Sequence, residues 1–187
     1  MTELDFRNYT SNHVESFRGI NFSQLEEAVC FLQQMQESRS ILWTAGNGGS
    51  ASTASHLSND LSKGLDPNGV TNIRTICLTD STPTLTAWAN DEGYDKAIAQ
   101  EIATLADSKD AVLAISGSGN SENIINAIKS AKQKGMKIIS LTGFDGGEVS
   151  TLSDININIA LRDMQVVEDM HLILCHWIMR RLKSLTR

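Results

Sequence analysis

The chain has 187 residues, of which 41% are hydrophobic and 20% are charged. This composition is typical of a soluble globular protein, and no apolar run approaches the length of about 18 residues that a membrane span requires. The formal net charge of −6 argues against a nucleic-acid-binding surface. The length suits one domain, residues 1–187, and the amino terminus lacks a secretion-signal pattern, so we expect a cytoplasmic protein.

Helices and strands alternate along the chain. An amphipathic helix is predicted over residues 24–38, within a helical extension that covers about residues 1–39. Five short apolar runs predict buried strands at residues 41–45, 73–79, 111–116, 137–143 and 155–160. Helical patterns lie between these runs at residues 52–61, 91–106 and 122–135, and a final helix is predicted over about residues 163–184. Gly135 is the expected end of the third of these helices.

This alternation predicts an α/β fold. We expect a three-layer αβα sandwich around a five-stranded, mostly parallel sheet, with helical extensions at both ends of the chain. Cys30, Cys77 and Cys175 are odd in number and fall inside apolar patterns, which indicates reduced core thiols rather than disulfides. The basic tail, residues 180–187, is interpreted as a solvated helix end that the helix dipole favours.

Two glycine-rich loops follow predicted strands and lead into predicted helices. The first glycine loop is "GNGGS", residues 46–50, and the second glycine loop is "SGSGNS", residues 116–121. Ligands of parallel sheets bind at the carboxyl ends of the strands, where free N–H groups and hydroxyls hold anions such as phosphate. The alternative is that glycine and serine only form tight turns. Neither loop has the Walker or the dinucleotide-binding pattern, so a sugar phosphate is favoured over a nucleotide.

Four motifs together carry a family resemblance: "GNGGSASTASHLSNDL", "WANDEGYD", "AISGSGNSENIINAIKSAKQKGMKIISLTGFDGGE" and "VVEDMHLILCH". In this order, over residues 41–177, they resemble the sugar isomerase (SIS) domain of the phosphoheptose isomerase branch. The resemblance implies the SIS fold and a homotetramer with active sites at subunit interfaces. It also implies conversion of sedoheptulose 7-phosphate to D-glycero-D-manno-heptose 7-phosphate, a step toward the heptose of bacterial lipopolysaccharide.

The resemblance also implies roles for individual residues. An enediol mechanism needs a base and an acid, and the matching residues are Asp60 and His176. Some members of the family bind zinc, and the matching ligands are His56, Asp60, Glu168 and His176. The implied substrate-binding residues are Asn47, Gly48 and Ser50 of the first loop, the pair Asn90 and Asp91 on another loop, Ser116, Gly117, Ser118 and Ser121 of the second loop, and Glu168.

The chain departs from the family pattern at several of these positions. Asp60 replaces a glutamate, Glu168 a glutamine, Gln165 an aspartate and Gly117 a threonine. An arginine that follows the glutamate in the family is missing from the segment after Leu61. Two alternatives therefore stay open. One is an isomerase for another sugar phosphate, and the other is a non-catalytic SIS protein that binds a replication initiator or a sugar phosphate.

Histidine, aspartate and tryptophan side chains are also interpreted from their surroundings in the sequence. His176 lies in the apolar stretch "LILCHWIM", where a histidine is either a satisfied core group or a functional group at a dry site, and the functional role is favoured because Glu168 is close along the helix. His171 is expected to be structural, and Asp163 and Asp169 to be solvated. The tryptophans, Trp43, Trp88 and Trp177, are expected in the core or at subunit contacts.

Overall fold

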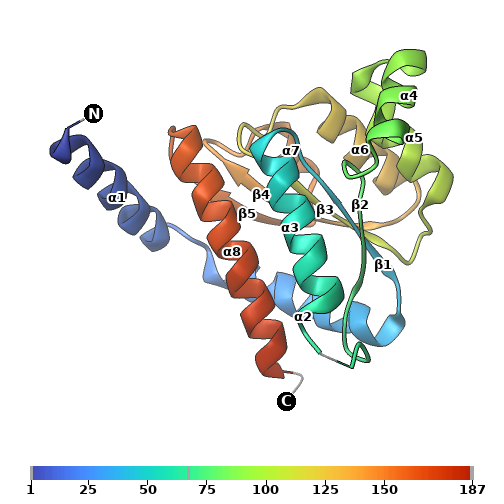
Figure 1. Cartoon of the computed structure of the whole chain (residues 1–187), viewed down its shortest axis with the longest axis horizontal. Helices are drawn as coiled ribbons and strands as arrows, with labels where there is room; N and C mark the ends of the chain where they lie inside the picture. The colour runs from blue at the N-terminus through green and yellow to red at the C-terminus, as the bar shows by residue number, and fades with distance from the viewer. Residues whose placement is uncertain (1, 67, 186–187) are drawn as a thin grey trace.

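The computed structural model describes residues 2–66 and 68–185, and it contains one sheet of five parallel strands between layers of helices (Figure 1). The strands lie in the order β2-β1-β3-β4-β5. Their bounds are Ile41–Ala45 for β1, Arg74–Cys77 for β2, Ala111–Ser116 for β3, Lys137–Gly143 for β4 and Ile155–Ile159 for β5. The predicted α/β fold with a five-stranded parallel sheet is confirmed.

Helices cover both faces of this sheet. Their bounds are Glu3–Arg18 for α1, Phe22–Ser38 for α2, Gly49–Lys63 for α3, Thr82–Glu92 for α4, Tyr94–Leu105 for α5, Glu122–Gln133 for α6, Gly147–Leu152 for α7 and Met164–Leu185 for α8. Within the described residues, no helix combines the length and the apolar character that a membrane crossing needs.

Alternating side chains along the strands build a separate core on each face. Leu42 and Leu113 belong to the core that α2, α3 and α8 cover, whereas their neighbours Trp43 and Val112 belong to the core beneath α5 and α6. Trp43 is therefore a core residue, as predicted. Trp88 and Trp177 are only half-buried. The ring of Trp177 packs edge-on against Phe22.

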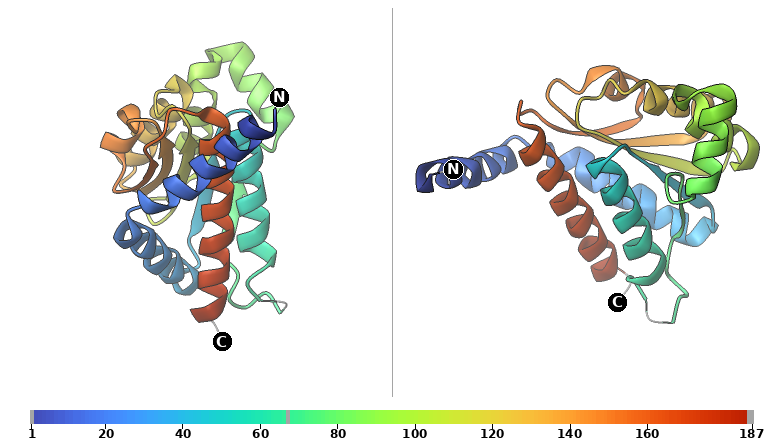
Figure 2. Two further views of the ribbon diagram at one scale, coloured as in Figure 1. Left: turned by 90° about the vertical axis from the view of Figure 1, so that its left-hand side faces the viewer. Right: turned by 45° about the horizontal axis from the view of Figure 1, so that its top comes forward.

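The helices α3 and α8 lie side by side on one face of the sheet and run in the same direction (Figures 1 and 2). The contacts between them fit this parallel arrangement. Glu168 faces Gly49 near the start of both helices, and Met179 faces Gly64 near the end of α3. The packing of these two helices therefore brings residues that are more than 100 positions apart in the sequence onto one shared surface.

Helix α1 projects away from the rest of the chain and has no buried residue (Figure 2). Its Tyr9 hydroxyl donates a hydrogen bond to Asp169 on α8, and His13 Nε2 lies 3.0 Å from the same carboxylate. Asp169 was predicted to be solvated, and this is wrong in part, because its half-exposed carboxylate joins the two helices. Asp163 accepts a hydrogen bond from the backbone N–H of Val166 at the start of α8.

The structure corrects one of the predicted helices and adds helices that were not predicted. The helix expected at residues 91–106 is two helices, α4 and α5, which meet at Gly93 with a φ of +96°. Asn90 and Asp91 consequently lie in the last turn of α4 rather than in a loop. The short helix α7 was not predicted. Gly135 follows the last turn of α6 with a φ of +79°, as expected for a helix end.

Cys30 is exposed on α2, so its prediction as a core thiol is wrong, whereas Cys77 and Cys175 are buried. The three cysteines form no disulfide. Of the predicted basic tail, residues 180–185 belong to α8, while residues 186 and 187 lie outside the described part of the chain. Arg181 in this tail forms a half-exposed ion pair with Glu26 of α2.

Candidate active site

The two glycine loops lie next to each other because they follow neighbouring strands. Ala45, the last residue of β1, pairs in register with Ala114 of β3. Gly46 is buried, and a Cβ at this position would lie 2.5 Å from the backbone carbonyl of Ser50. Only glycine therefore lets the first loop turn this tightly into α3. The structure thus brings the two predicted loops to one edge of the sheet.

The second glycine loop presents hydroxyl groups at the start of α6. Ser116 Oγ is buried and has no hydrogen-bond partner in the described residues. Ser121 is the N-cap of α6, yet its side chain makes no capping hydrogen bond. Ser118 Oγ accepts only a hydrogen bond of 3.2 Å from the backbone N–H of Asn120. Unpaired hydroxyls beside the positive end of a helix are suited to hold an anion.

Gly117 lies beneath the side chain that begins α8. A Cβ at Gly117 would lie 2.5 Å from the sulfur atom of Met164. The space of the threonine side chain that the resemblance led us to expect at this position is therefore filled by a thioether.

Asn47 of the first loop is held by two residues that the sequence did not reveal. Its amide exchanges two hydrogen bonds of 2.8 Å with the amide of Asn123 on α6. The hydroxyl of Tyr94 on α5 donates a third hydrogen bond, of 2.7 Å, to Asn47 Oδ1. In the sequence, Asn123 is only a polar position of an amphipathic helix, and its partner lies 76 residues away.

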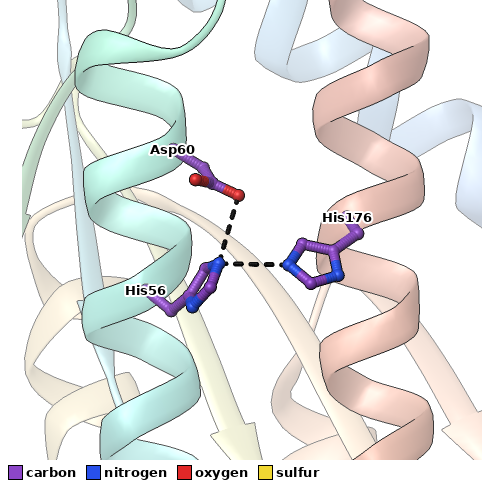
Figure 3. Close-up of side chains that lie close together, drawn as sticks. All are labelled: His56, Asp60 and His176. Atoms are coloured by element: carbon purple, nitrogen blue, oxygen red, sulfur yellow. Dashed lines mark hydrogen bonds and ion pairs between the residues drawn. The ribbon is translucent and has the colours of Figure 1, made fainter.

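Three polar side chains converge between α3 and α8 (Figure 3). His56 and Asp60 lie one helical turn apart on α3, with His56 Nε2 at 3.4 Å from Asp60 Oδ2. His176 on α8 completes the group, and its Nε2 lies 3.0 Å from His56 Nε2. His176 is exposed, so the expectation of a dry site in an apolar stretch is wrong. The stretch appears apolar only because the other faces of α8 contact the core.

The donor set of this group fits a metal ion. His56, Asp60 and His176 each offer one ligand atom, and these atoms all lie within 4.8 Å of one another. Zinc binds imidazole nitrogens at about 2.0–2.1 Å, which puts two nitrogens of a tetrahedral site roughly 3.3 Å apart. The 3.0 Å between the two Nε2 atoms is close to that spacing. Three protein ligands with an open fourth position are typical of catalytic zinc.

Glu168 does not belong to this group. Its carboxylate packs against Gly49, where a Cβ would lie 2.5 Å from Oε2, and so it faces the start of α3. His56 lies about two turns further along that helix. Of the four predicted metal ligands, three thus lie together, and Glu168 lies beside the first glycine loop instead.

Most of the other predicted contact residues lie at the surface. Asn90 and Asp91 are exposed on α4, where Asn90 Nδ2 donates a hydrogen bond of 2.9 Å to Asp91 Oδ1. Gly48 is exposed and has a φ of +52°, whereas Ser50 is buried in the first turn of α3. Gln165 is exposed near the start of α8.

Two buried groups lie behind the site. Burial, with a smaller contribution from the nearby Asp60 carboxylate, raises the pKa of the Cys175 thiol to about 12. This thiol therefore stays protonated and is not a nucleophile. His171 Nε2 donates a hydrogen bond of 3.0 Å to the Thr142 carbonyl oxygen. His171 is completely buried in the layer between α8 and the sheet, which agrees with its predicted structural role.

Comparison with known proteins shows consistent similarities. The sequence model described as the SIS domain matches residues 5–143. A phosphoheptose isomerase of Helicobacter pylori (strain P12) is 36% identical over 154 residues, which cover 81% of this chain and 79% of the relative. The structure of a phosphoheptose isomerase from Francisella tularensis aligns with a TM-score of 0.90 at 26% identity, over 98% of this chain and all of that one. The phosphoheptose isomerase GmhA from Neisseria gonorrhoeae aligns with a TM-score of 0.88 at 27% identity, covering 97% and 96%.

Proposed function

The chain belongs to the SIS-domain family and to its phosphoheptose isomerase branch, and from this premise we propose that it converts sedoheptulose 7-phosphate to D-glycero-D-manno-heptose 7-phosphate. The product would supply heptose for lipopolysaccharide precursors, and the enzyme would act in the cytoplasm. The observation that carries the proposal is the convergence of His56, Asp60 and His176 on helices that pack beside two glycine loops. This arrangement combines an anion-binding loop with proton-transfer groups.

We assign the phosphate of the substrate to the second glycine loop. The buried Ser116 hydroxyl has no partner in the described residues, and the N-cap Ser121 leaves its hydroxyl unused. The first backbone N–H groups of α6 have no acceptor within the helix, and they add the positive end of its dipole. Ser118 and the backbone N–H of Gly117 complete the proposed cradle.

The sugar would extend from this cradle toward the first glycine loop. Asn47, Gly48 and Ser50 are proposed to contact its hydroxyls, together with the Asn90–Asp91 pair. Glu168 lies against Gly49 and is therefore proposed as a hydrogen-bond acceptor for a sugar hydroxyl rather than as a metal ligand.

Proton transfer is assigned to Asp60 and His176. Asp60 takes a proton from C1 of the ketose while His176 gives a proton to the carbonyl oxygen on C2, and the two steps form an enediol. Return of a proton to C2 and loss of the proton on the C1 oxygen then yield the aldose. His56, with its Nε2 3.0 Å from His176 and 3.4 Å from Asp60, holds both groups in place.

As a second state of this group, we propose that His56, Asp60 and His176 can instead bind zinc, because their donor atoms and spacing suit this ion; a His176 Nε2 that holds zinc would not donate a proton. When bound, zinc would act as a Lewis acid that stabilises the negative charge developing on the substrate oxygens. The chain is also proposed to form a homotetramer with active sites at subunit interfaces. The exposed position of His176 and the unburied helix α1 support this proposal.

The test is turnover of sedoheptulose 7-phosphate by the purified full chain, with and without added zinc. We expect turnover that the substitutions Asp60→Ala and His176→Ala both abolish. A folded, zinc-loaded sample without turnover would contradict the proposed reaction. A screen of other sugar phosphates would then separate an isomerase of different specificity from a non-catalytic binding protein.

A further inference from the structure

A pair of asparagine amides joins the first glycine loop to the first turn of α6, which follows the second glycine loop. Asn47 Nδ2 donates to Asn123 Oδ1, and Asn123 Nδ2 donates to Asn47 Oδ1, each over 2.8 Å. Asn47 belongs to the first loop, and Asn123 is the second residue of α6, immediately after the second loop. These hydrogen bonds connect the proposed sugar-binding loop to the helix that follows the proposed phosphate-binding loop.

Asn123 is only 4% exposed, so its amide depends on this partner. A buried amide without a hydrogen bond costs roughly 1–3 kcal/mol, which strongly favours the paired arrangement. Because the two bonds are reciprocal, they fix both the position and the rotation of the Asn47 amide. The exposed Tyr94 holds the same amide from α5, through the hydrogen bond that its hydroxyl donates to Asn47 Oδ1.

The three hydrogen bonds also decide what Asn47 offers to a ligand. Its amide oxygen accepts from both Asn123 and Tyr94, which uses the two lone pairs of that oxygen. One of its two amide N–H groups is bonded to Asn123, and the other remains. In this state Asn47 can donate a hydrogen bond to a ligand oxygen, but it cannot accept a hydrogen bond from a sugar hydroxyl.

We propose that Asn123 is a positioning residue that orients Asn47 for sugar recognition, with Tyr94 in support. Asn123 does not contact the sugar in this scheme, and it acts only through Asn47. Because it lies in the first turn of the helix whose amino terminus is proposed to face the phosphate, it links phosphate binding to the placement of the sugar-binding amide. This inference rests on the proposed function, since it takes the first loop as the sugar-binding loop.

The experiment measures two dissociation constants by calorimetry, one for sedoheptulose 7-phosphate and one for inorganic phosphate. The variants are Asn47→Ala, Asn123→Ala and the double variant. Asn126→Ala is the matched control, because this asparagine lies one turn further along α6 and bonds to the Asp95 carbonyl oxygen on α5 instead. Tyr94→Phe tests the supporting hydroxyl, and thermal melting monitors folding.

We expect Asn123→Ala to weaken sugar phosphate binding about tenfold to a hundredfold, while inorganic phosphate binding changes less than about threefold. The double variant should bind no worse than the weaker single variant, because Asn123 acts through Asn47. Asn126→Ala should bind both ligands like the unmodified chain. Tyr94→Phe should weaken only the sugar phosphate, by a few fold.

Equal weakening of both ligands by Asn123→Ala would overturn the proposal, because it would indicate general support of α6. Losses that multiply in the double variant would also overturn it. A chain that binds sedoheptulose 7-phosphate without turning it over would refute the proposed reaction, yet the same dissociation constants would still decide the role of Asn123. A chain that does not distinguish the sugar phosphate from inorganic phosphate would refute both.

Discussion

Among the positions at which this chain departs from the isomerase pattern, Asp60 is the most informative. An aspartate in place of a glutamate moves the carboxylate closer to α3 by one methylene group. The structure places that carboxylate 3.4 Å from His56 Nε2 and within 4.8 Å of the His176 ligand atom, so the shorter side chain still joins the group. The side chain of Asp60 is 20% exposed, which leaves it accessible to a ligand.

The substitution Asp60→Asn tests this carboxylate with little change of shape. We expect turnover of sedoheptulose 7-phosphate to fall by about a hundredfold or more, because an amide cannot accept the proton. The neighbouring Asn59→Ala, on the exposed side of α3, is the control and should keep its activity. Steady-state kinetics on both variants gives the result, and unchanged turnover in Asp60→Asn would remove this residue from the mechanism.

His171 predicts how stability depends on pH. Burial lowers its pKa to about 4, and the hydrogen bond to the Thr142 carbonyl oxygen offsets only part of this effect. The ordinary pKa of histidine in an unfolded chain is about 6.5, so between pH 6.5 and 4 the unfolded state binds the extra proton. Acidification through this window therefore reduces the free energy of unfolding, by about 3 kcal/mol for this group.

The variant His171→Gln removes the titration but keeps a side-chain donor for the Thr142 carbonyl oxygen. Urea denaturation at pH 7 and pH 4 should show that the unmodified chain loses about 3 kcal/mol more stability than the variant does. The comparison concerns the change with pH, so a constant destabilisation by the substitution does not affect it. If the free energy of unfolding changed equally with pH in both chains, the lowered pKa of His171 would not be the cause of the pH dependence.

At the scale of elements, the strands were predictable and the contacts between elements were not. Strands β1, β3 and β4 match their predicted ranges because each is a continuous apolar run buried on both faces. Helix α4 was missed because it has no buried residue, although Thr82 and Pro83 are typical of a helix start.

The candidate site follows the same rule. His56 and Asp60 were expected from the family resemblance, and the two loops were predictable from the strands that they follow. The role of Asn123 was not predictable, because only the packing of the folded chain brings its amide to Asn47. The position of Glu168 likewise depends on how α8 lies against α3.

Gly46 tests whether the turn between β1 and α3 sets the site. In Gly46→Ala the new methyl group would meet the Ser50 backbone, which cannot rotate away, so α3 must shift at its start. We expect a stability loss of about 1–3 kcal/mol and roughly a hundredfold loss of turnover.

The control for this variant is Gly135→Ala, at the end of α6. A Cβ there meets no atom within 4 Å, but the φ of +79° is strained for alanine. It should cost about 1 kcal/mol of stability and no turnover. Thermal melting and kinetics on both variants separate local strain from displacement of α3, and a fully active Gly46→Ala would count against a role for the turn.

At the scale of the whole molecule, α1 has no buried residue of its own and reaches the core only through Tyr9, among the residues that the structure describes. It exposes four large apolar side chains, Leu4, Phe6, Val14 and Phe17, which are between 46% and 66% accessible. An isolated helix of 16 residues is marginal in water, and most helices are stabilised by burying an apolar face. Its hydrogen bonds to Asp169 fix one side of the helix and leave this apolar surface open.

A second copy of the chain is the partner that the proposed tetramer supplies for this surface. The double substitution Phe6→Ser with Phe17→Ser removes two aromatic side chains. Burial of each would stabilise the assembly by about 1.5–3 kcal/mol. Because an oligomer is symmetric, the loss occurs at every equivalent contact. We expect light scattering to show smaller assemblies at micromolar concentration, together with reduced turnover if the active sites lie at the interfaces. Val70→Ser, which alters an equally exposed apolar residue on the loop before β2, should change neither. If the unmodified chain is monomeric and fully active, α1 has another role and the active site is complete within one chain.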